Sequence, residues 1–331
     1  MMIILTLLIG SLCGCRSTEL DQHVSLSPPC DSYIYCYGPL LHDVQMSGTF
    51  NDSKEFVDMR LLHSPNETMK TFMEMKKFGN FNIKSFIQNH FDNSTNEFEE
   101  WKPTDWNLRP KFINEIKDEK LQLWAIELNS IWKQLGRKIK DDVRLNPERY
   151  SIVYVPNPII VPGGRFREMY YWDSYWIIRG LLLCEMKNTV KGMLINYVSM
   201  INTFGHIPNG GRIYYTKRSQ PPMMLPMIHS YVEATHDMQF LAENIDMLEK
   251  EFTYWITYHT VDIPIKGKDN NTIYTLARYN DSSSGPRPES YWEDVTKASI
   301  FKTDDEKEAF YSELKAGAES GWDFSSRWFV N

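Results

Sequence analysis

Helices that come in pairs are the feature that most constrains the fold of this chain. In each predicted helix the apolar residues recur at helical spacing, and a long loop rich in Gly, Pro and polar residues follows every second helix. Helix pairs of this kind pack side by side as hairpins, and their loops then gather on one face. The pattern therefore predicts an all-α chain. The predicted helices span residues 110–140, 172–186, 187–203, 226–237, 241–259 and 304–316.

The remaining segments predict little regular structure. No long alternation of apolar and polar residues is present, and residues 151–155 form the only predicted strand. A loop rich in Pro, Ser and Asn is predicted at 262–288. Residues 21–68 have a similar composition and predict an extended arm, with short helical turns at 54–59 and 68–78.

The composition is that of a folded, acidic protein. With 331 residues, 42% of them hydrophobic, the chain can bury a sizeable core. A net charge of -7 without a basic block argues against nucleic acid as a partner, because phosphate binding needs clustered Lys and Arg. We predict three segments: a signal peptide at 1–16, an N-terminal arm with short helices at 17–109, and a helical domain at 110–331.

The N-terminus predicts a secreted protein. Residues 1–10 are an apolar run that is too short to span a bilayer and has the size of a signal-peptide core, although it lacks a basic residue. Residues 12–15 also resemble a bacterial lipoprotein cleavage site, which makes a lipid anchor the alternative. No other stretch is long and apolar enough to form a membrane anchor. N-glycosylation sequons, which agree with secretion, begin at Asn51, Asn66, Asn93, Asn270 and Asn280.

Cysteine usage also fits an extracellular protein. Cys30 and Cys36 lie close together in a segment rich in Pro and Tyr and can form a small disulfide loop. Cys184 follows three leucines, where a thiol packs as a small hydrophobe more often than it reacts. The sequence has no CxxC or HExxH pattern and its 8 His are scattered, so no metal or organic cofactor is predicted.

The loop before the second helix, residues 161–176, is the first of four segments that combine charge with aromatic residues. Two glycines let the backbone approach a ligand closely, and two Arg, a Glu and Asp173 follow them. The glycines lack the Lys-Ser/Thr ending of a phosphate loop. The structural alternative is that Asp173 caps the helix and the aromatic residues fill the core. That alternative leaves the Arg and Glu charges unexplained, so we favour a ligand-binding loop.

Two further loops carry groups that suit pairs of sugar hydroxyls. Asn209, Arg218 and Gln220 lie in the second loop and present planar hydrogen-bonding groups, although loop residues of this kind are commonly just solvated. In the third loop, prolines frame Arg287 and Glu289. The alternative there is a helix start with Glu289 in its first turn.

The fourth segment places a carboxyl group among aromatic residues. Asp323 lies between Trp322 and Phe324, with Trp328 nearby. Such surroundings desolvate the carboxylate and raise its pKa, as a general acid requires near neutral pH, whereas a plain helix cap is the alternative role. Aromatic residues make up 14% of the chain, which suits either a core or a groove that stacks on sugar rings. The four loops predict a carbohydrate enzyme, and the absence of GxSxG argues against a serine hydrolase.

Residues 162–175 resemble a signature of the trehalases, the inverting glycoside hydrolases that split α,α-trehalose into two glucoses. Residues 30–46 are similar to the opening of animal, particularly insect, trehalases. The resemblance implies an (α/α)6 toroid, trehalose as the small-molecule partner, and Asp323 of the Gly-Trp-Asp sequence as the catalytic acid. The residues that it implies in substrate binding are Arg165, Trp172, Asp173, Asn209, Arg218, Ser219, Gln220, Arg287, Glu289 and Gly321.

The chain departs from the family pattern at its C-terminal end. Trehalases are longer and carry a Gln-Trp-Asp signature followed by a glutamate that acts as general base, whereas this sequence contains no Gln-Trp-Asp and ends at Asn331. The resemblance then implies an incomplete toroid without its base. Asp173 and Glu289 are carboxylates that could substitute, but each has a binding role by resemblance. We expect a truncated trehalase with little activity, and the alternative is a non-catalytic trehalose-binding or regulatory fragment.

Overall fold

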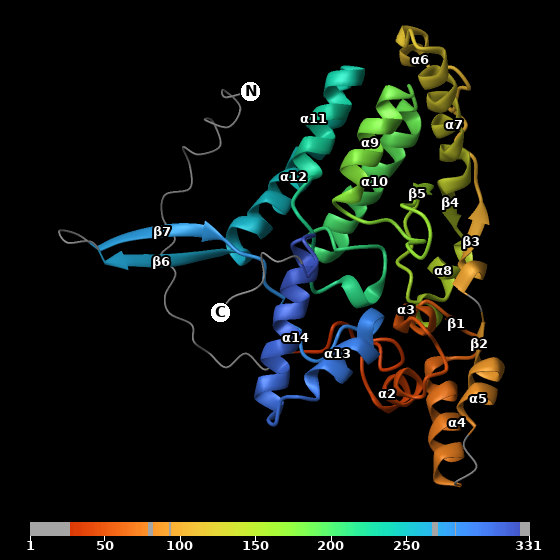
Figure 1. Cartoon of the computed structure of the whole chain (residues 1–331), viewed down its shortest axis with the longest axis vertical. Coiled ribbons are helices and arrows are strands. Elements are labelled where there is room, and N and C mark those ends of the chain that lie inside the picture. Colours follow the sequence, from red (N-terminus) through yellow and green to blue (C-terminus); the bar gives the residue numbers. More distant parts are fainter. Residues whose placement is uncertain (1–26, 79–81, 93, 267–270, 282, 325–331) are drawn as a thin grey trace.

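Helices dominate the chain (Figure 1). The computed structural model describes residues 27–78, 82–92, 94–266, 271–281 and 283–324. Within these ranges no helix combines the length and the apolar character needed to cross a bilayer. The prediction of an all-α chain is confirmed, and the incomplete (α/α)6 toroid stays a prediction. The α-helices are α2 (Pro39–Met46), α3 (Ser53–Val57), α4 (Pro65–Lys77), α5 (Ile83–His90), α6 (Lys111–Glu115), α7 (Glu119–Leu135), α8 (Asp141–Leu145), α9 (Asp173–Leu183), α10 (Lys187–Phe204), α11 (Met224–Thr235), α12 (Met238–Tyr258), α13 (Tyr291–Ala298) and α14 (Asp304–Glu319).

The two helix pairs predicted in the middle of the chain form neighbouring hairpins, α9–α10 and α11–α12. Helix α10 packs against α9, α11 and α12, and α11 also contacts α9. Helix α7 also packs against α9, because its Trp132 lies over Gly180. A Cβ atom at Gly180 would lie 2.9 Å from the ring of Trp132. Helix α9 lies beside α11 and α10 beside α12, and we call this double row the helix layer; in Figure 1, α13 and α14 lie below it. This layer holds the larger hydrophobic core and carries the polar loops at one end.

The boundaries of these helices agree with the predicted ones to within a few residues. Helix α10 ends at Phe204, and Gly205 after it has a φ of 84°, the left-handed conformation that favours glycine at the end of a helix. Helix α14 starts with a capping box, in which Thr303 and Glu306 bond each other's backbone N–H groups. The sequence therefore locates most of the central helices correctly.

The single helix predicted at 110–140 is wrong, because the structure divides it. The side chain of Asp118 accepts hydrogen bonds from the N–H groups of Lys120 and Leu121 and starts α7 anew. Helix α7 ends at Leu135, and Gly136 follows it. A Cβ atom at Gly136 would lie 2.5 Å from the carbonyl oxygen of Trp101, so this close approach requires glycine.

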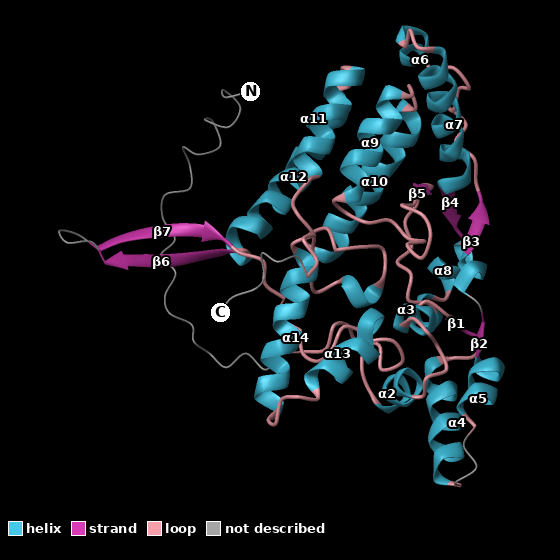
Figure 2. Ribbon diagram, viewed as in Figure 1, coloured by secondary structure: helices cyan, strands magenta, loops and turns pink. Residues whose placement is uncertain are grey.

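Strands occur in segments for which the sequence predicts none (Figure 2). The strand predicted at 151–155 is wrong, since only Ile152 makes an isolated bridge. The loop predicted at 262–288 instead contains most of a projecting β-hairpin, because Val261, Ile263 and Ile265 alternate around a proline that disguises the strand. The strands are β1 (Arg60–Leu61), β2 (Phe91–Asp92), β3 (Phe98–Glu100), β4 (Gly136–Ile139), β5 (Ile159–Ile160), β6 (Thr260–Lys266) and β7 (Asn271–Ala277), paired as β1–β2, β3–β4–β5 and β6–β7.

The extended arm predicted at 21–68 is also wrong, because much of this segment folds. Helix α2 forms there, and α3 and α4 confirm the short helical turns predicted at 54–59 and 68–78. Their apolar residues build a second core, in which Leu40, Leu41 and Phe56 pack with Tyr170 and Tyr215 of the polar loops. The N-terminal segment is therefore docked against the loop end of the helix layer.

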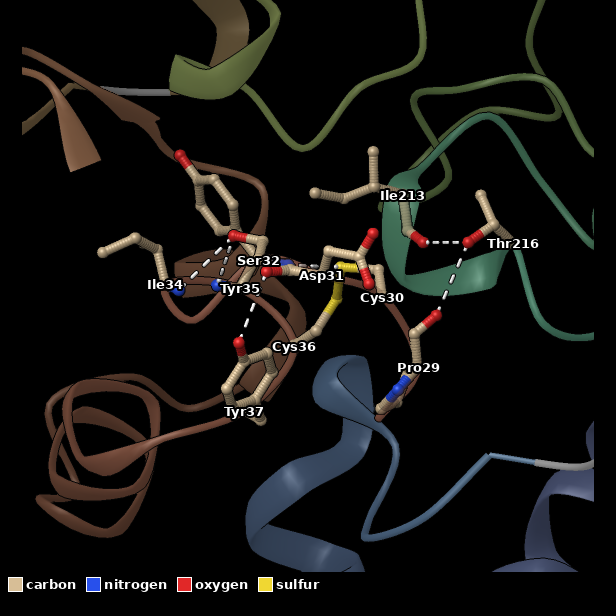
Figure 3. The surroundings of a disulfide bond; sticks show 10 residues. All are labelled: Pro29, Cys30, Asp31, Ser32, Ile34, Tyr35, Cys36, Tyr37, Ile213 and Thr216. Atoms are coloured by element: carbon tan, nitrogen blue, oxygen red, sulfur yellow. Dashed lines mark hydrogen bonds between the residues drawn. A yellow bond between two sulfur atoms is a disulfide. The ribbon is translucent and has the colours of Figure 1, made fainter. Parts of the chain in front are cut away.

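The Cys30–Cys36 disulfide is confirmed (Figure 3). Inside its loop, the hydroxyl of Ser32 accepts hydrogen bonds from two backbone N–H groups. Cys184 is a buried free thiol, as predicted. The hydroxyl of Thr216 donates to a backbone carbonyl just before the disulfide, which ties this segment to the loop between α10 and α11. The predicted signal peptide at 1–16 and the sequon residues Asn93 and Asn270 lie outside the described residues.

Candidate active site

A cavity of about 240 Å³ lies where the four polar loops meet. The loop before α9, the loop between α10 and α11, the segment that ends in the 3-10 turn Pro288–Ser290, and the end of α14 each supply part of its wall. Helix α3 of the N-terminal segment completes the wall. The lining residues are Lys54, Pro162, Arg165, Phe166, Tyr170, Trp172, Asp173, Asn209, Tyr215, Arg218, Gln220, Arg287, Glu289, Ser290, Ala318, Gly321 and Asp323.

Every predicted site residue except Ser219 lines this cavity. Ser219 lies behind the lining, because its side chain is fully buried and its hydroxyl donates to the carbonyl of Ile207 over 2.7 Å. A direct side-chain contact with a ligand in the cavity does not fit that position. Ser219 instead helps to fix the backbone that carries its two neighbours.

Sequence reasoning misses several lining residues. Phe166 and Tyr170 belong to the first loop, and the aromatic composition of that loop is the signal that points to them. Lys54 comes from α3, far away in the chain, and pairs with Asp58 one helical turn later over 2.6 Å. That spacing of opposite charges on a predicted helical turn is the only sequence signal for Lys54.

Trp172 and Gly321 form one wall in close contact. Gly321 has a φ of 69°, and a Cβ atom there would lie 2.6 Å from the ring of Trp172. The backbone N–H of Trp172 donates to Oε1 of Gln220 over 3.1 Å, which joins the first and second loops. Glycine at 321 therefore lets the segment that bears Asp323 approach an indole ring suited to stacking on a sugar.

Arg218 and Glu289 form a buried ion pair across the cavity wall. Nε of Arg218 also donates to Oδ1 of Asn209 over 2.9 Å, and its guanidinium group lies 5.0 Å from the ring centre of Tyr215. The Oε2 atom of Glu289 is buried and has no hydrogen-bond partner among the described residues, although Glu289 lines the cavity. This oxygen is therefore an unused acceptor inside the cavity wall.

The other two lining arginines are held by carboxylates. Arg287 donates from Nε and a terminal nitrogen to Asp294, over 2.9 and 2.6 Å. Arg165 is half-exposed and pairs with Asp52 of the N-terminal segment over 2.6 Å. Both guanidinium groups are thereby oriented before any ligand arrives, which reduces the entropy that binding must cost.

The carboxyl groups of the cavity titrate in different directions. Burial raises the pKa of Asp323, and Arg287 and Arg218 offset part of that effect. Burial also raises the pKa of Asp173, and the neighbouring Asp323 adds to it. Burial opposes ionisation of Glu289 as well, but there the two arginines prevail and lower the pKa. The cavity thus favours the protonated form of Asp323 and the ionised form of Glu289. Acid catalysis needs two carboxyl groups whose pKa values are separated in this way.

A fully buried charge cluster lies behind this cavity. Arg212 is 0% exposed and donates to both oxygens of Glu97, over 3.0 and 2.6 Å, and to Glu168 over 3.3 Å. Lys54 pairs with Asp58 and Glu168 over 2.6 and 2.7 Å. These contacts join the N-terminal segment to the first two loops. No group of three or more His, Cys, Asp or Glu residues able to hold a metal ion occurs in the described ranges.

Comparison with known proteins defines the class to which this fold and cavity belong. The family model for trehalase matches residues 48–331, and the chain belongs to the trehalase family, as its sequence resemblance predicts. It is 56% identical over 307 residues to a trehalase of Apis mellifera, covering 91% of this chain and 48% of the relative. It is 48% identical over 316 residues to a trehalase of Homo sapiens (94% and 53%), and 45% over 319 residues to one of Tenebrio molitor (95% and 57%). The chain spans about half the length of these curated relatives.

Proposed function

We propose that this chain binds α,α-trehalose and carries the acid half of an inverting glycoside hydrolysis that yields two glucoses. Family membership and the composition of the cavity support this proposal. The observation that carries it is Asp323, a carboxyl group with a raised pKa that lines a cavity together with Arg287 and Arg218. A protonated acid beside preoriented guanidinium groups suits cleavage of a bond between two sugars.

In the proposed mechanism Asp323 donates its proton to the oxygen that joins the two sugar rings. Arg218, Arg287 and Gln220 hold sugar hydroxyls by hydrogen bonds, and the ring of Trp172 stacks on an apolar sugar face. The carboxylate of Glu289, which lines the cavity, accepts a hydroxyl hydrogen. These contacts hold the bond to be broken within reach of the acid, which lowers the entropy cost of the transition state.

Inversion requires a second carboxylate that activates water, about 6.5–9.5 Å from the acid. The other carboxyl groups of the described cavity wall are Asp173 and Glu289. Glu289 is neutralised by Arg218, and the pKa of Asp173 is raised, so neither has the properties of a free base. We therefore expect the 331-residue chain to bind trehalose and to release little glucose from it.

Calorimetric titration with trehalose and a glucose-release assay on the purified chain test both halves of this proposal. We expect saturable binding, with glucose release at least about a hundredfold slower than that of the Tenebrio molitor trehalase, since the described cavity wall offers no free base. The variant Asp323→Asn is expected to bind trehalose and to lose any residual release. Rapid turnover that Asp323→Asn abolishes would show that the chain contains a base. Failure to bind would refute the choice of trehalose as ligand.

We also propose that the protein is secreted through a signal peptide at 1–16. The Cys30–Cys36 disulfide supports this, because disulfides persist in oxidising compartments. Asn51 and Asn66 are exposed, as glycan acceptors must be. We expect insect cells that express the chain to release it into the medium with N-linked glycans. Retention of an unglycosylated chain inside the cells would contradict the proposal, and a chain with both asparagines changed to Gln is the control for the glycan mass.

A further inference from the structure

One buried carboxylate outside the cavity lining joins three parts of the site. Glu319 is the last residue of α14, is 0% exposed, and precedes Asp323 by one short turn of chain. Its Oε1 accepts a hydrogen bond from the backbone N–H of Ser219, and its Oε2 accepts one from the backbone N–H of Asn280, each over 2.8 Å. A single side chain therefore links segments that are far apart in the sequence.

Each linked segment carries cavity residues. Ser219 lies between Arg218 and Gln220, both of which line the cavity. Asn280 begins the segment that leads to Arg287 and Glu289. Fixing these two backbone N–H groups on one carboxylate sets the distance between the second and third loops, and the end of α14 brings Asp323 to the same place.

Other residues of α14 also bind the segment that follows Asn280, but their hydrogen bonds do not extend to the second loop. Nζ of Lys315 donates to the carbonyl of Ser283. Glu308 accepts a hydrogen bond from the backbone N–H of Gly285 over 2.7 Å. Neither contact reaches the Ser219 segment. Within the described residues, Glu319 thus supplies a hydrogen bond between α14 and the loop that carries Arg218.

The chemistry of the contact requires a carboxylate. Two backbone donors approach the two oxygens, and a glutamine would offer one oxygen and turn an N–H₂ group toward the other donor. Burial of a charge is costly, and here it raises the pKa of Glu319 to about 7 although both backbone N–H groups oppose the shift. A carboxyl group held in such a place at this cost suggests a role beyond packing.

We propose that Glu319 is a positioning residue, which sets the spacing of the Arg218 and Arg287 segments around Asp323 and so determines the affinity for the disaccharide. The identity of the ligand rests on the proposed function. Glu319 contacts no ligand itself, because it does not line the cavity. Its effect passes through the Ser219 and Asn280 backbones.

The test compares Glu319→Gln with Glu313→Gln, the same change at an exposed position of the same helix. Hydrogen exchange of the Ser219 and Asn280 amides and calorimetric titration with trehalose are measured at a temperature where each variant is folded. We expect Glu319→Gln to accelerate exchange of at least one of these amides about tenfold or more, and to weaken trehalose binding about tenfold or more. The Ile207 amide, which Glu251 holds over 3.0 Å, is expected to keep its protection, and Glu313→Gln to change neither readout.

The possible results separate the two proposals. Wild-type protein that does not bind trehalose refutes the proposed function. Wild-type binding with an unchanged affinity in Glu319→Gln overturns the positioning role, whether or not exchange accelerates, since faster exchange alone would mean a purely structural contact. If Glu319→Gln does not fold, Glu319→Asp replaces it, because it keeps the charge but is one methylene too short to reach both amides, and the same criteria apply.

Discussion

Replacement of Arg218 with Ala is expected to destabilise the fold by about 3–5 kcal/mol at neutral pH and to weaken trehalose binding beyond detection by calorimetry. Arg218 is 2% exposed and bonds both Glu289 and Asn209. Without it, Oε1 of Glu289 loses its guanidinium partner, and Oε2 has no bond among the described residues. The variant therefore buries a carboxylate whose bonded cation is gone, which costs more than the intact pair contributes.

This loss has a defined dependence on pH. In the wild type the pKa of Glu289 is lowered, so its ionised form stabilises the fold above the ordinary range of a carboxyl group, and that contribution is lost as the pH falls. In Arg218→Ala, burial prevails and protonation in mild acid removes the buried charge. We expect the difference in unfolding free energy between wild type and variant to be largest near pH 7 and smaller near pH 4, and urea unfolding at both pH values measures it.

Two comparisons make the Arg218 prediction specific. Adding Glu289→Gln to Arg218→Ala removes the unpaired charge and is expected to recover part of the lost stability at pH 7. Arg144→Ala removes an exposed arginine with a 3.7 Å contact to Asp141, and its expected cost is below about 1 kcal/mol. An Arg218→Ala protein as stable as the wild type at pH 7 would mean that the buried ion pair does not hold the second and third loops together.

The sequence predicts the central helices better than it predicts buried ion pairs such as Arg218–Glu289. Helical periodicity and end signals are local, so α10 and its stop at Gly205 follow from residues within a few turns. Where a local signal is masked the prediction fails, as at Pro264, which disguises β6, and at Asp118, which begins a new helix inside an apolar pattern. The N-terminal segment fails for another reason, because the apolar surface that buries α2 and α3 comes from loops much later in the chain.

The candidate site divides in the same way. Most of its lining residues lie in four short segments whose mixture of charge and aromatic residues is visible locally. The resemblance to trehalases predicts Asp323 as the acid among several carboxyl groups. Lys54 and Glu319 could not be identified from the sequence, because their partners are distant in the chain. Glu168 lies more than one hundred positions after Lys54, and Ser219 lies one hundred positions before Glu319. Side chains that join distant segments carry no local pattern, and in this protein they assemble the site.

Arg212→Met is expected to be the most damaging single change in the described chain. Arg212 is the cation that bonds Glu97 and Glu168, and its Nε lies 3.5 Å from Asp58. Its loss leaves three buried carboxylates, of which Asp58 and Glu168 still pair with Lys54, while Glu97 loses the cation that it bonds. Breaking one such pair costs about 3–5 kcal/mol, and the total stability of a domain is about 5–15 kcal/mol, so we expect most of the variant to be unfolded at pH 7 and 25 °C.

The cost of Arg212→Met is expected to fall as the pH falls. Burial raises the pKa of Glu97 to about 7 even with Arg212 present. A carboxyl group with a raised pKa stabilises the fold fully at pH values below its ordinary pKa, and that contribution is lost as the pH rises through 7. Removal of Arg212 raises this pKa further. Circular dichroism at pH 5 and pH 7 is therefore expected to show more folded variant at the lower pH.

A second substitution distinguishes lost pairing from lost volume. Because well-packed apolar residues can replace a buried ion pair without loss of stability, Arg212→Met with Glu97→Met is expected to recover at pH 7 part of the stability that Arg212→Met loses, and to remove most of its pH dependence. Lys76→Met, which breaks a half-exposed pair with Asp43, is expected to cost about 1 kcal/mol or less. If Arg212→Met melts like Lys76→Met, the buried cluster does not join the N-terminal segment to the loops, and the apolar contacts of Tyr170 and Tyr215 must do so instead.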